Sequence, residues 1–504
     1  MTPTVVIADR PTPGTPRPYD FPPFRRERLA NGLTLLIVDL PGRPLVSASL
    51  ILRRGAADES PLHAGAAVLA ARALSEGTER YDAIELVEAA ERLGASLHAE
   101  AGWDASSASI DVPATRLEPA LALLEEMVAR PTFPEGEVER LRDERLNDLL
   151  QARADPRRRA DEVFADTVYT PSSPYHRPAG GTRETVPGLA PAVLREVHET
   201  ALDPARMTLI VGGDLGDLDV VAIANRLFGG WTSPPGARPA GEIPATSAVS
   251  ERFVRVIHRP GSVQTEIRIG HVGVPRQIPD FHALSVMGAI LGGLFNSRLN
   301  MKLREEKGYT YGAHAGFDLR RAAGPFAARA AVNTEVTVPA IADFLAELGR
   351  IHDEPVTADE LRGARDFLVG VFPLRFETAG AVVGALAGMV VHDLPDDELA
   401  RYRPAIEAVT IDDVQRAARR RLDLERAAIV LVGDVDAFGA ELEGAGFGDV
   451  VVERDEGPAA PGPLEDVDHA PGPVDDAHAG PTEGAEEPDE GVEDPTESHR
   501  DDDR

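Results

Sequence analysis

Cysteine is absent from the 504 residues of this sequence. Disulfides, thiolate zinc sites and cysteine nucleophiles are therefore excluded. Aromatic residues are scarce, at 5% of the chain, whereas 43% of the residues are hydrophobic, so we expect cores built mainly from Ala, Leu and Val. A chain of this length exceeds what one hydrophobic core usually serves, which predicts two or more domains.

The sequence also lacks an apolar run long enough to cross a bilayer. The longest, AGAVVGALAGMVV at 379–391, is too short and is interrupted by glycine. The N-terminal segment 1–23 is rich in proline and has no basic region followed by an apolar stretch. It predicts an extended arm rather than a signal peptide. We therefore expect a soluble, cytoplasmic protein without a membrane partner.

Positive charge is in short supply, and the formal net charge is −32. Residues 455–504 hold 18 Asp and Glu against 2 Arg, so half of that charge, −16, lies in this C-terminal segment. The mildly acidic remainder argues against a nucleic-acid partner. Pro, Gly, Asp and Glu dominate from 453 onward, which predicts a disordered, solubilising acidic tail. Attraction of basic peptides is the alternative role for this tail.

A repeat with one constant offset runs through the chain. LDPARMTLIVGGD at 202–214 matches LDLERAAIVLVGD at 422–434. The same offset relates two further pairs of segments, namely 46–60 with 266–280 and 189–201 with 409–421. Several segments that agree on one shift indicate two copies of one domain.

The pattern within the copies predicts an α+β fold. Asn31-Gly32 is a hairpin signal between two short strands, and alternating stretches are grouped with runs of helical sequence. We expect two homologous domains, each a mostly antiparallel sheet with helices packed on it. The expected boundaries are an arm at 1–23, a first domain at 24–231, a linker at 232–248, a second domain at 249–452 and the tail at 453–504.

Self-contained catalytic motifs are missing. His198-Glu199 begins an HExxH pattern, but position 202 is Leu, so the second zinc ligand is absent. No G-x-S-x-G nucleophile elbow and no phosphate-binding G-x-x-x-x-G-K-[ST] loop occurs. The histidines in strand-like segments are interpreted as packed or surface side chains; these are His98, His258, His271 and His314.

One segment carries a functional pattern, SRLNMKLREEKGYTYGAHAGFD at 297–318. It predicts an amphipathic helix that stops at Lys307-Gly308, followed by a strand that begins with Tyr309 and Tyr311 on one face. This unit resembles the second-domain motif of the pitrilysin/insulinase-like peptidases, which include the mitochondrial processing peptidase. The matching residues are Arg298, Leu299, Leu303, Arg304, Glu305, Gly308 and Tyr311.

The resemblance extends over about residues 24–450 and includes FGGW at 228–231. It implies two α+β domains that enclose a substrate chamber with partner domains, and substrate-backbone binding by Arg304 and Tyr311. An arginine beside a sheet edge is suited to this role, because its N–H groups donate to the carbonyls of an extended peptide. The alternative from residue type alone is that Arg304 pairs with a nearby Glu and Tyr311 packs under the helix.

The zinc helix of that family reads HxxEH and ends shortly before Gly-Thr. Counted back from Gly77-Thr78, the two histidine places hold Val68 and Arg72, and the place of the general base holds Ala71. The third ligand falls near Asn147-Asp148, where Asp148 alone is acidic. A catalytic zinc needs three protein ligands, and Arg72 adds a permanent positive charge. The resemblance therefore implies a degenerate site, with no metal or cofactor in this chain.

Three hypotheses follow for the function. The first is a non-catalytic, substrate-binding subunit that forms a heterodimer with a homologous HxxEH-bearing subunit, which supplies the zinc that cleaves extended peptides. The second is a structural or interaction protein derived from the peptidase fold. The third is an active single-chain peptidase, which requires zinc ligands that the sequence does not show. The short loop at 291–293 does not imply a presequence-like substrate.

Overall fold

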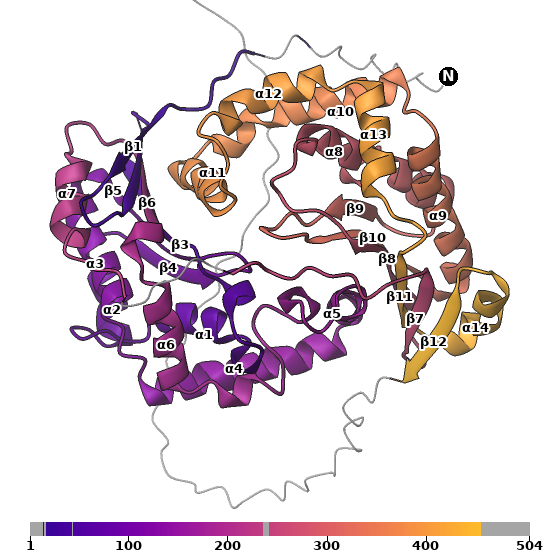
Figure 1. Ribbon diagram of the computed structural model, residues 1–504, viewed down its shortest axis with the longest axis horizontal. Coiled ribbons are helices and arrows are strands. Elements are labelled where there is room, and N and C mark those ends of the chain that lie inside the picture. Colours follow the sequence, from indigo (N-terminus) through magenta and orange to yellow (C-terminus); the bar gives the residue numbers. More distant parts are fainter. Residues whose placement is uncertain (1–13, 15–16, 43, 235–240, 455–504) are drawn as a thin grey trace, which may run out of the picture. The chain divides into compact units, whose positions relative to one another are not determined.

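The computed structural model describes residues 14, 17–42, 44–234 and 241–454, and all of them belong to one compact unit. The unit contains two six-stranded sheets with helices packed on them (Figure 1). The acidic tail from 455 onward, and most of the Pro-rich arm, lie outside the described residues. The predicted α+β class with two homologous halves is confirmed.

The first sheet has the strand order β1-β2-β6-β3-β5-β4. Only the β2–β6 pair is parallel, and the other neighbours are antiparallel. The Asn31-Gly32 turn joins β1 to β2, and the Asn31 amide donates to the carbonyl oxygens of Phe228 and Trp231. The strands are β1 (Phe24–Arg28), β2 (Thr34–Asp39), β3 (Leu45–Leu52), β4 (Ser96–Ala101), β5 (Ser106–Pro113) and β6 (Met207–Gly213).

The second sheet repeats this order with one change, as β12-β7-β11-β8-β10-β9. The outer strand β12 comes from the end of the described chain and pairs parallel to β7, whereas β1 pairs antiparallel to β2. β12 runs to Arg454, past the predicted start of the tail at 453. The strands are β7 (Phe253–His258), β8 (Gln264–Val272), β9 (Ala313–Phe317), β10 (Pro325–Asn333), β11 (Ala428–Gly433) and β12 (Asp449–Arg454).

The helices follow the same repeat. Helix α6 and helix α13 begin and end at positions that are related by the predicted offset. The first half contributes α1 (Ala66–Ala73), α2 (Ala83–Glu91), α3 (Leu117–Ala129), α4 (Glu135–Ala154), α5 (Pro156–Val168), α6 (Pro191–Ala201) and α7 (Val220–Phe228). The second contributes α8 (Phe281–Gly288), α9 (Thr337–Asp353), α10 (Ala358–Val371), α11 (Ala379–Val391), α12 (Glu398–Ala408), α13 (Ile411–Arg421) and α14 (Val435–Gly444).

The two halves exchange one helix each. Helix α5 of the first half packs on β8 and β11 of the second sheet, where Val163 and Phe164 share a core with Val430. Helix α11 of the second half packs on β3 and β6 of the first sheet, where Val383 shares a core with Ile210 (Figure 1). Each sheet therefore has one face covered by the other half.

The exchange explains the long apolar run at 379–391. That run forms α11, which is apolar on almost all sides, as expected for a helix between two packed layers. Among the described residues, no single helix is long and apolar enough to cross a membrane. Two consecutive helical segments, 358–376 and 379–391, are together long and apolar enough to cross a membrane. However, the pair is bent by 115° at the break between them.

Candidate functional site

Helix α1 occupies the place predicted for a zinc helix. It begins after Gly65, whose φ of 99° is left-handed and whose added Cβ would lie 2.6 Å from the Gly180 carbonyl oxygen. The carboxylate of Glu59 accepts from the amides of Gly65 (2.9 Å) and Ala67 (2.5 Å). Arg177 donates to Glu59 over 3.3 Å, and both side chains are buried. This pair fixes the start of α1 by hydrogen bonds rather than by a metal.

The degenerate ligand positions of α1 form contacts that do not suit a cation. Val68 is half-buried and Ala71 is buried, and neither offers a ligand atom. Arg72 is exposed and donates to Glu144 of helix α4 over 2.8 Å. This hydrogen bond from Arg72 lowers the pKa of Glu144. An ion pair therefore joins the helices that two histidines and a carboxylate would join around zinc.

Asp148, at the position of the third ligand, is also held by neighbouring side chains. It lies on α4, one turn after Glu144, and accepts hydrogen bonds from Arg145 and Arg158. A carboxylate held by two guanidinium groups is a poor ligand for a divalent cation, because the ion would have to displace both. The donor set around α1 therefore does not fit a catalytic zinc, and we derive no metal-dependent step for this chain.

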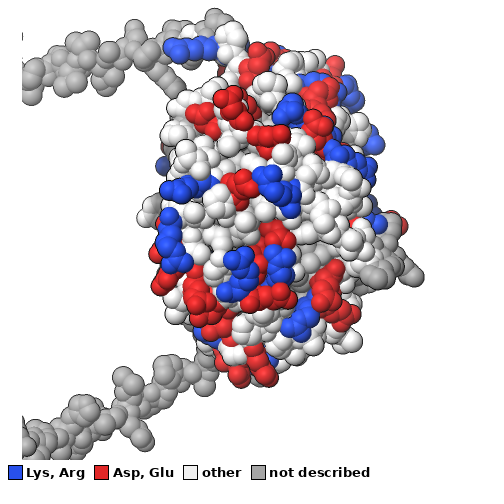
Figure 2. All heavy atoms as spheres, turned by 90° about the vertical axis from the view of Figure 1, so that its left-hand side faces the viewer, with Lys and Arg blue, Asp and Glu red and all other residues white. Residues whose placement is uncertain are grey.

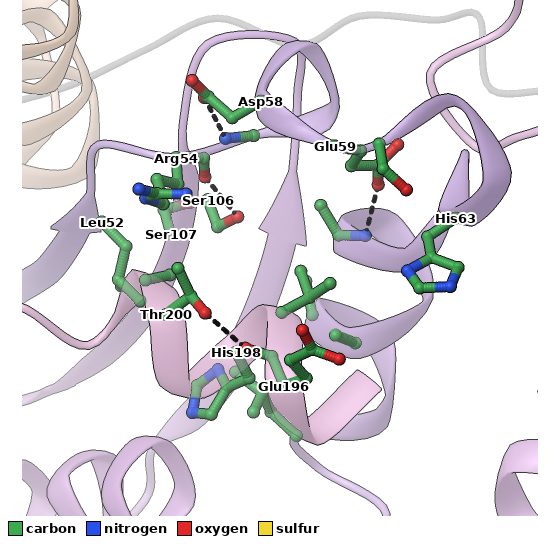
Figure 3. Close-up of a pocket in the computed structure, with 18 residues that line it drawn as sticks. Leu52, Arg54, Asp58, Glu59, His63, Ser106, Ser107, Glu196, His198 and Thr200 are labelled. Atoms are coloured by element: carbon green, nitrogen blue, oxygen red, sulfur yellow. Dashed lines mark hydrogen bonds between the residues drawn. The ribbon is translucent and has the colours of Figure 1, made fainter. Parts of the chain in front are cut away.

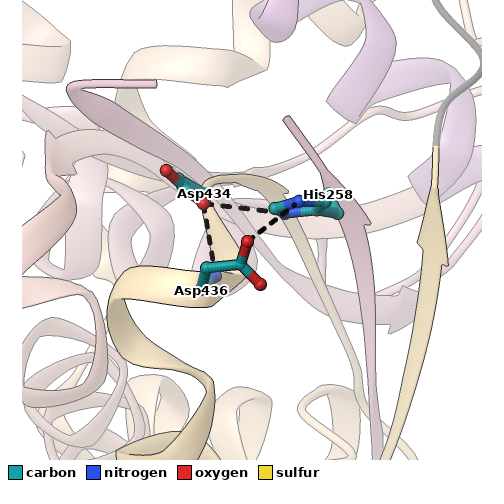
Figure 4. A group of neighbouring side chains, drawn as sticks. All are labelled: His258, Asp434 and Asp436. Atoms are coloured by element: carbon teal, nitrogen blue, oxygen red, sulfur yellow. Dashed lines mark hydrogen bonds and ion pairs between the residues drawn. The ribbon is translucent and has the colours of Figure 1, made fainter. Parts of the chain in front are cut away.

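One group of potential metal ligands does lie elsewhere in the described chain. His258 at the end of β7 lies near Asp434 and Asp436 at the start of α14 (Figure 4). However, its Nδ1 accepts from the Val435 amide at 3.2 Å, and Asp434 accepts from the Asp436 amide at 3.2 Å. Both hydrogen bonds are made to backbone amides of the first turn of α14, so the group supports the start of that helix.

A cavity of about 190 Å³ lies beside Ala71, between α1 and α6 (Figure 3). Its apolar wall includes Leu52, Ala67 and Val197, and its polar rim includes Glu59, His63 and Ser106. The polar groups are mostly committed elsewhere, since Ser106 donates to the Arg54 carbonyl. Burial lowers the pKa of His198, whose Nε2 hydrogen-bonds to the Val128 carbonyl. The cavity therefore offers space but no nucleophile paired with a base.

Arg304 lies in the second half, in a π-helix at Asn300–Glu306. Its guanidinium carbon lies 4.3 Å from the centre of the Phe295 ring. The nearest carboxylate is that of Glu305, 3.6 Å from Nε, which is longer than a hydrogen bond. Within the described part of the chain, Arg304 donates no side-chain hydrogen bond. The alternative was that a neighbouring Glu pairs with Arg304. Its only support among the described residues is this long contact with Glu305.

Tyr311 does not pack under the helix, since 95% of it is exposed. The prediction that a strand begins with Tyr309 is wrong, because β9 begins at Ala313 and the two tyrosines precede it. The reason is the pair of glycines around them, since Gly308 has a left-handed φ of 65° and ends the helix. Tyr309 packs against the core, and Tyr311 projects from the turn.

Two polar anchors hold this segment in place. Arg298, which matched the same motif, is buried and donates twice to Glu360 of α10, at 2.6 and 3.0 Å. The Asn300 amide donates to the Leu294 carbonyl and accepts from the Ala313 amide. Asn300 therefore ties the turn that carries Phe295 to the start of β9. The sequence did not single out Phe295, although an aromatic residue in a polar turn is unusual for so aromatic-poor a chain.

The two groups of predicted site residues lie on different halves. Val68, Ala71, Arg72 and Asp148 lie on α1 and α4, whereas Arg304 and Tyr311 lie beside β9. Both β4 and β9 are outermost strands of their sheets in the described structure. An outermost strand presents unpaired N–H and C=O groups, which an extended peptide can pair with.

The outer surface of the first half carries side chains of both charge signs. Figure 2 shows basic and acidic side chains interspersed on that face. Nucleic acids require a continuous basic surface, which this face does not provide.

Two family models match the chain. One is described as "Insulinase (Peptidase family M16)" and covers residues 34–173, and the other as "Peptidase M16 inactive domain" and covers residues 189–368. An uncharacterized zinc protease of Mycobacterium leprae is 24% identical over 81% of this chain and 91% of its own length. The non-peptidase homolog YmxG of Helicobacter pylori is 24% identical over 66% of this chain and 76% of its own length.

Solved structures show the same fold. A peptidase M16 inactive domain from Pseudomonas fluorescens has a TM-score of 0.75 and 26% identity, and covers 82% of this chain and 98% of that one. A protease from Helicobacter pylori has a TM-score of 0.76 over 82% of this chain and 100% of that one. At 18% identity this second likeness shows the fold alone.

Proposed function

Because the chain belongs to the insulinase-like M16 peptidase family, we propose that it is the non-catalytic, substrate-binding subunit of a two-chain zinc peptidase. A homologous HxxEH-bearing subunit supplies the zinc, and this chain holds the extended peptide. The proposal rests on the contrast between the two groups of site residues, those on α1 and α4 and those beside β9. At two of the ligand positions, Arg72 and Asp148 are held in ion pairs. Arg304 and Tyr311, in contrast, remain accessible beside an outermost strand.

The proposed binding mode uses backbone pairing. An extended peptide lies along β9 as an added strand, and the guanidinium of Arg304 donates to its carbonyl oxygens. The guanidinium is suited to this because no protein acceptor within the described residues takes its hydrogen bonds. The exposed ring of Tyr311 covers the peptide from the turn before the strand.

The test of this function is the Arg304→Ala variant, co-expressed with the HxxEH-bearing homologue. A hydrogen bond from a charged group contributes about 1.5–3 kcal/mol, so kcat/KM for an unfolded polypeptide should fall about 10- to 150-fold. Lys302→Ala is the matched control, because Lys302 lies on the same helix and pairs with Glu306. Full activity of the Arg304→Ala pair contradicts the binding role.

A second candidate is a structural or interaction protein without a role in proteolysis. Its support is the likeness to a relative called a non-peptidase homolog. Direct binding separates the two candidates, because the structural alternative predicts no affinity of the purified chain for fluorescein-labelled β-casein. Zinc analysis of the same sample tests the single-chain peptidase, since one zinc per chain together with cleavage would overturn both proposals.

A further inference from the structure

Phe295 is an exposed aromatic side chain in the turn between two π-helices, Ala289–Gly293 and Asn300–Glu306. Its exposed fraction is 68%, so it contributes little to the core below. The guanidinium carbon of Arg304 lies 4.3 Å from its ring centre, well within the range of a cation–π contact. The ring is therefore placed as a surface on which the arginine rests.

This contact leaves the hydrogen-bonding edge of Arg304 available. Cation–π stacking uses the flat face of the guanidinium, while its five N–H groups point outward in the plane. Arg298 on the same segment is the opposite case, because Glu360 takes its N–H groups in two hydrogen bonds. A stacked arginine is held in position without losing its donors.

The backbone turn that carries the ring is held by the side chain of Asn300. The Asn300 amide donates to the carbonyl of Leu294, the residue before Phe295, and its oxygen accepts from the Ala313 amide at the start of β9. The turn that carries the ring and the strand that would pair with a peptide are therefore fixed to one another. Contact with this ring therefore fixes the position of the Arg304 side chain relative to β9.

We propose that Phe295 is a positioning residue of the peptide-binding site, which holds the guanidinium of Arg304 flat so that its N–H groups face a peptide beside β9. The inference rests on the proposed function. A long unbranched arginine loses much rotational freedom when it binds, and an aromatic surface that restricts it beforehand reduces that loss. Any flat aromatic ring at 295 serves this purpose, whereas an aliphatic side chain of similar size does not.

The test measures binding of fluorescein-labelled β-casein to the full chain by fluorescence anisotropy. We expect Phe295→Leu to weaken binding about 2- to 5-fold, the range of an exposed cation–π contact. Phe295→Tyr should bind as the wild type does. In the Arg304→Ala background, Phe295→Leu should have no further effect, because the side chain that it positions is gone. Phe367→Leu on α10 is the matched control, since Phe367 is also an exposed aromatic side chain.

The outcomes separate this inference from the function on which it rests. If Arg304→Ala binds β-casein as tightly as the wild type, the proposed function fails. If Arg304→Ala weakens binding but Phe295→Leu does not, only the positioning role fails. An equal effect of Phe295→Leu with and without Arg304, or a loss in Phe295→Tyr as large as in Phe295→Leu, also overturns it. Circular dichroism and thermal unfolding of each variant exclude a general loss of structure.

Discussion

Arg298 and Arg304 belong to one sequence motif, yet their surroundings differ. Arg298 is buried and paired with Glu360, whereas Arg304 rests on an exposed ring. Burial alone would raise the pKa of Glu360, but the hydrogen bonds from Arg298 and the Thr357 amide outweigh it and lower the pKa to about 2. The pair therefore fixes the segment only while Glu360 is ionised.

This pair predicts an acid-dependent loss of stability. A carboxyl whose pKa is lower in the folded state stabilises the fold above its unfolded pKa of 4.5, and that contribution disappears as the pH falls from 4.5 toward 2. Glu360→Gln should reduce the free energy of unfolding by about 1.5–3 kcal/mol at pH 7. It should also flatten the decline between pH 5 and pH 3 in urea titrations. Asp359→Asn, on the exposed side of the same helix, should leave that slope unchanged.

At the scale of residues, the sequence predicted the surroundings of α1 better than those of Arg304 and Tyr311. The absence of ligands at Val68, Ala71 and Arg72 follows from residue type, because no rotation gives Val or Ala a lone pair. The partner of Arg72 did not follow, since Glu144 approaches it only when α1 and α4 pack together. The exposure of Tyr311 depends on the turn after Gly308, and the contact of Arg304 with Phe295 depends on the turn that Asn300 holds. Side-chain periodicity reports neither turn.

At the scale of elements, the repeat was the most informative signal. One constant shift along the sequence related the central strands β3 and β8, β6 and β11, because buried strands keep their length and pattern. The exchange of α5 and α11 was not foreseen. Periodicity identifies an apolar face but does not say which sheet covers it. The apolar surround of α11 was the available sign that it lies between two layers.

Because α11 packs closely on the first sheet, one methyl group added at Gly212 should lower the stability of the fold. A Cβ added at Gly212 of β6 would lie 2.7 Å from Val38 Cγ1 and 2.9 Å from Val383 Cγ2 of α11. Because valine side chains have little rotational freedom, Gly212→Ala should destabilise the fold by about 1–3 kcal/mol in urea unfolding.

The source of that loss can be checked in two ways. Gly370→Ala on α10, where an added Cβ meets nothing within 4 Å, should be neutral or slightly stabilising. Val383→Ala should cost less in the Gly212→Ala background than in the wild type, because it relieves the close contact. An equal loss of unfolding free energy in both backgrounds would mean that the added methyl group does not contact α11.

At the scale of the molecule, the exchange makes the halves interdependent despite their shared ancestry. Without α11, the first sheet would expose Leu36, Ile51 and Ile210, which are now buried. Exposed apolar patches of this kind lead to aggregation. We expect residues 1–234 and 241–504, expressed separately, to be insoluble, and the two fragments expressed together to co-purify as a folded pair.

The control for this experiment is the intact chain with a protease site placed at 235–240. Cleavage of the folded protein there should leave both halves associated in size-exclusion chromatography. A first half that is soluble, monomeric and unfolds cooperatively on its own would contradict the dependence on α11.

The same exchange sets the order of events during synthesis. When β6 has left the ribosome, α11 is still about 170 residues away, which at about 5–20 residues per second means a delay of about 8–35 s. During that time one face of the first sheet has no covering helix. We therefore expect the nascent first half to stay partly open until the second half is made, with apolar surface that chaperones can shield in the meantime.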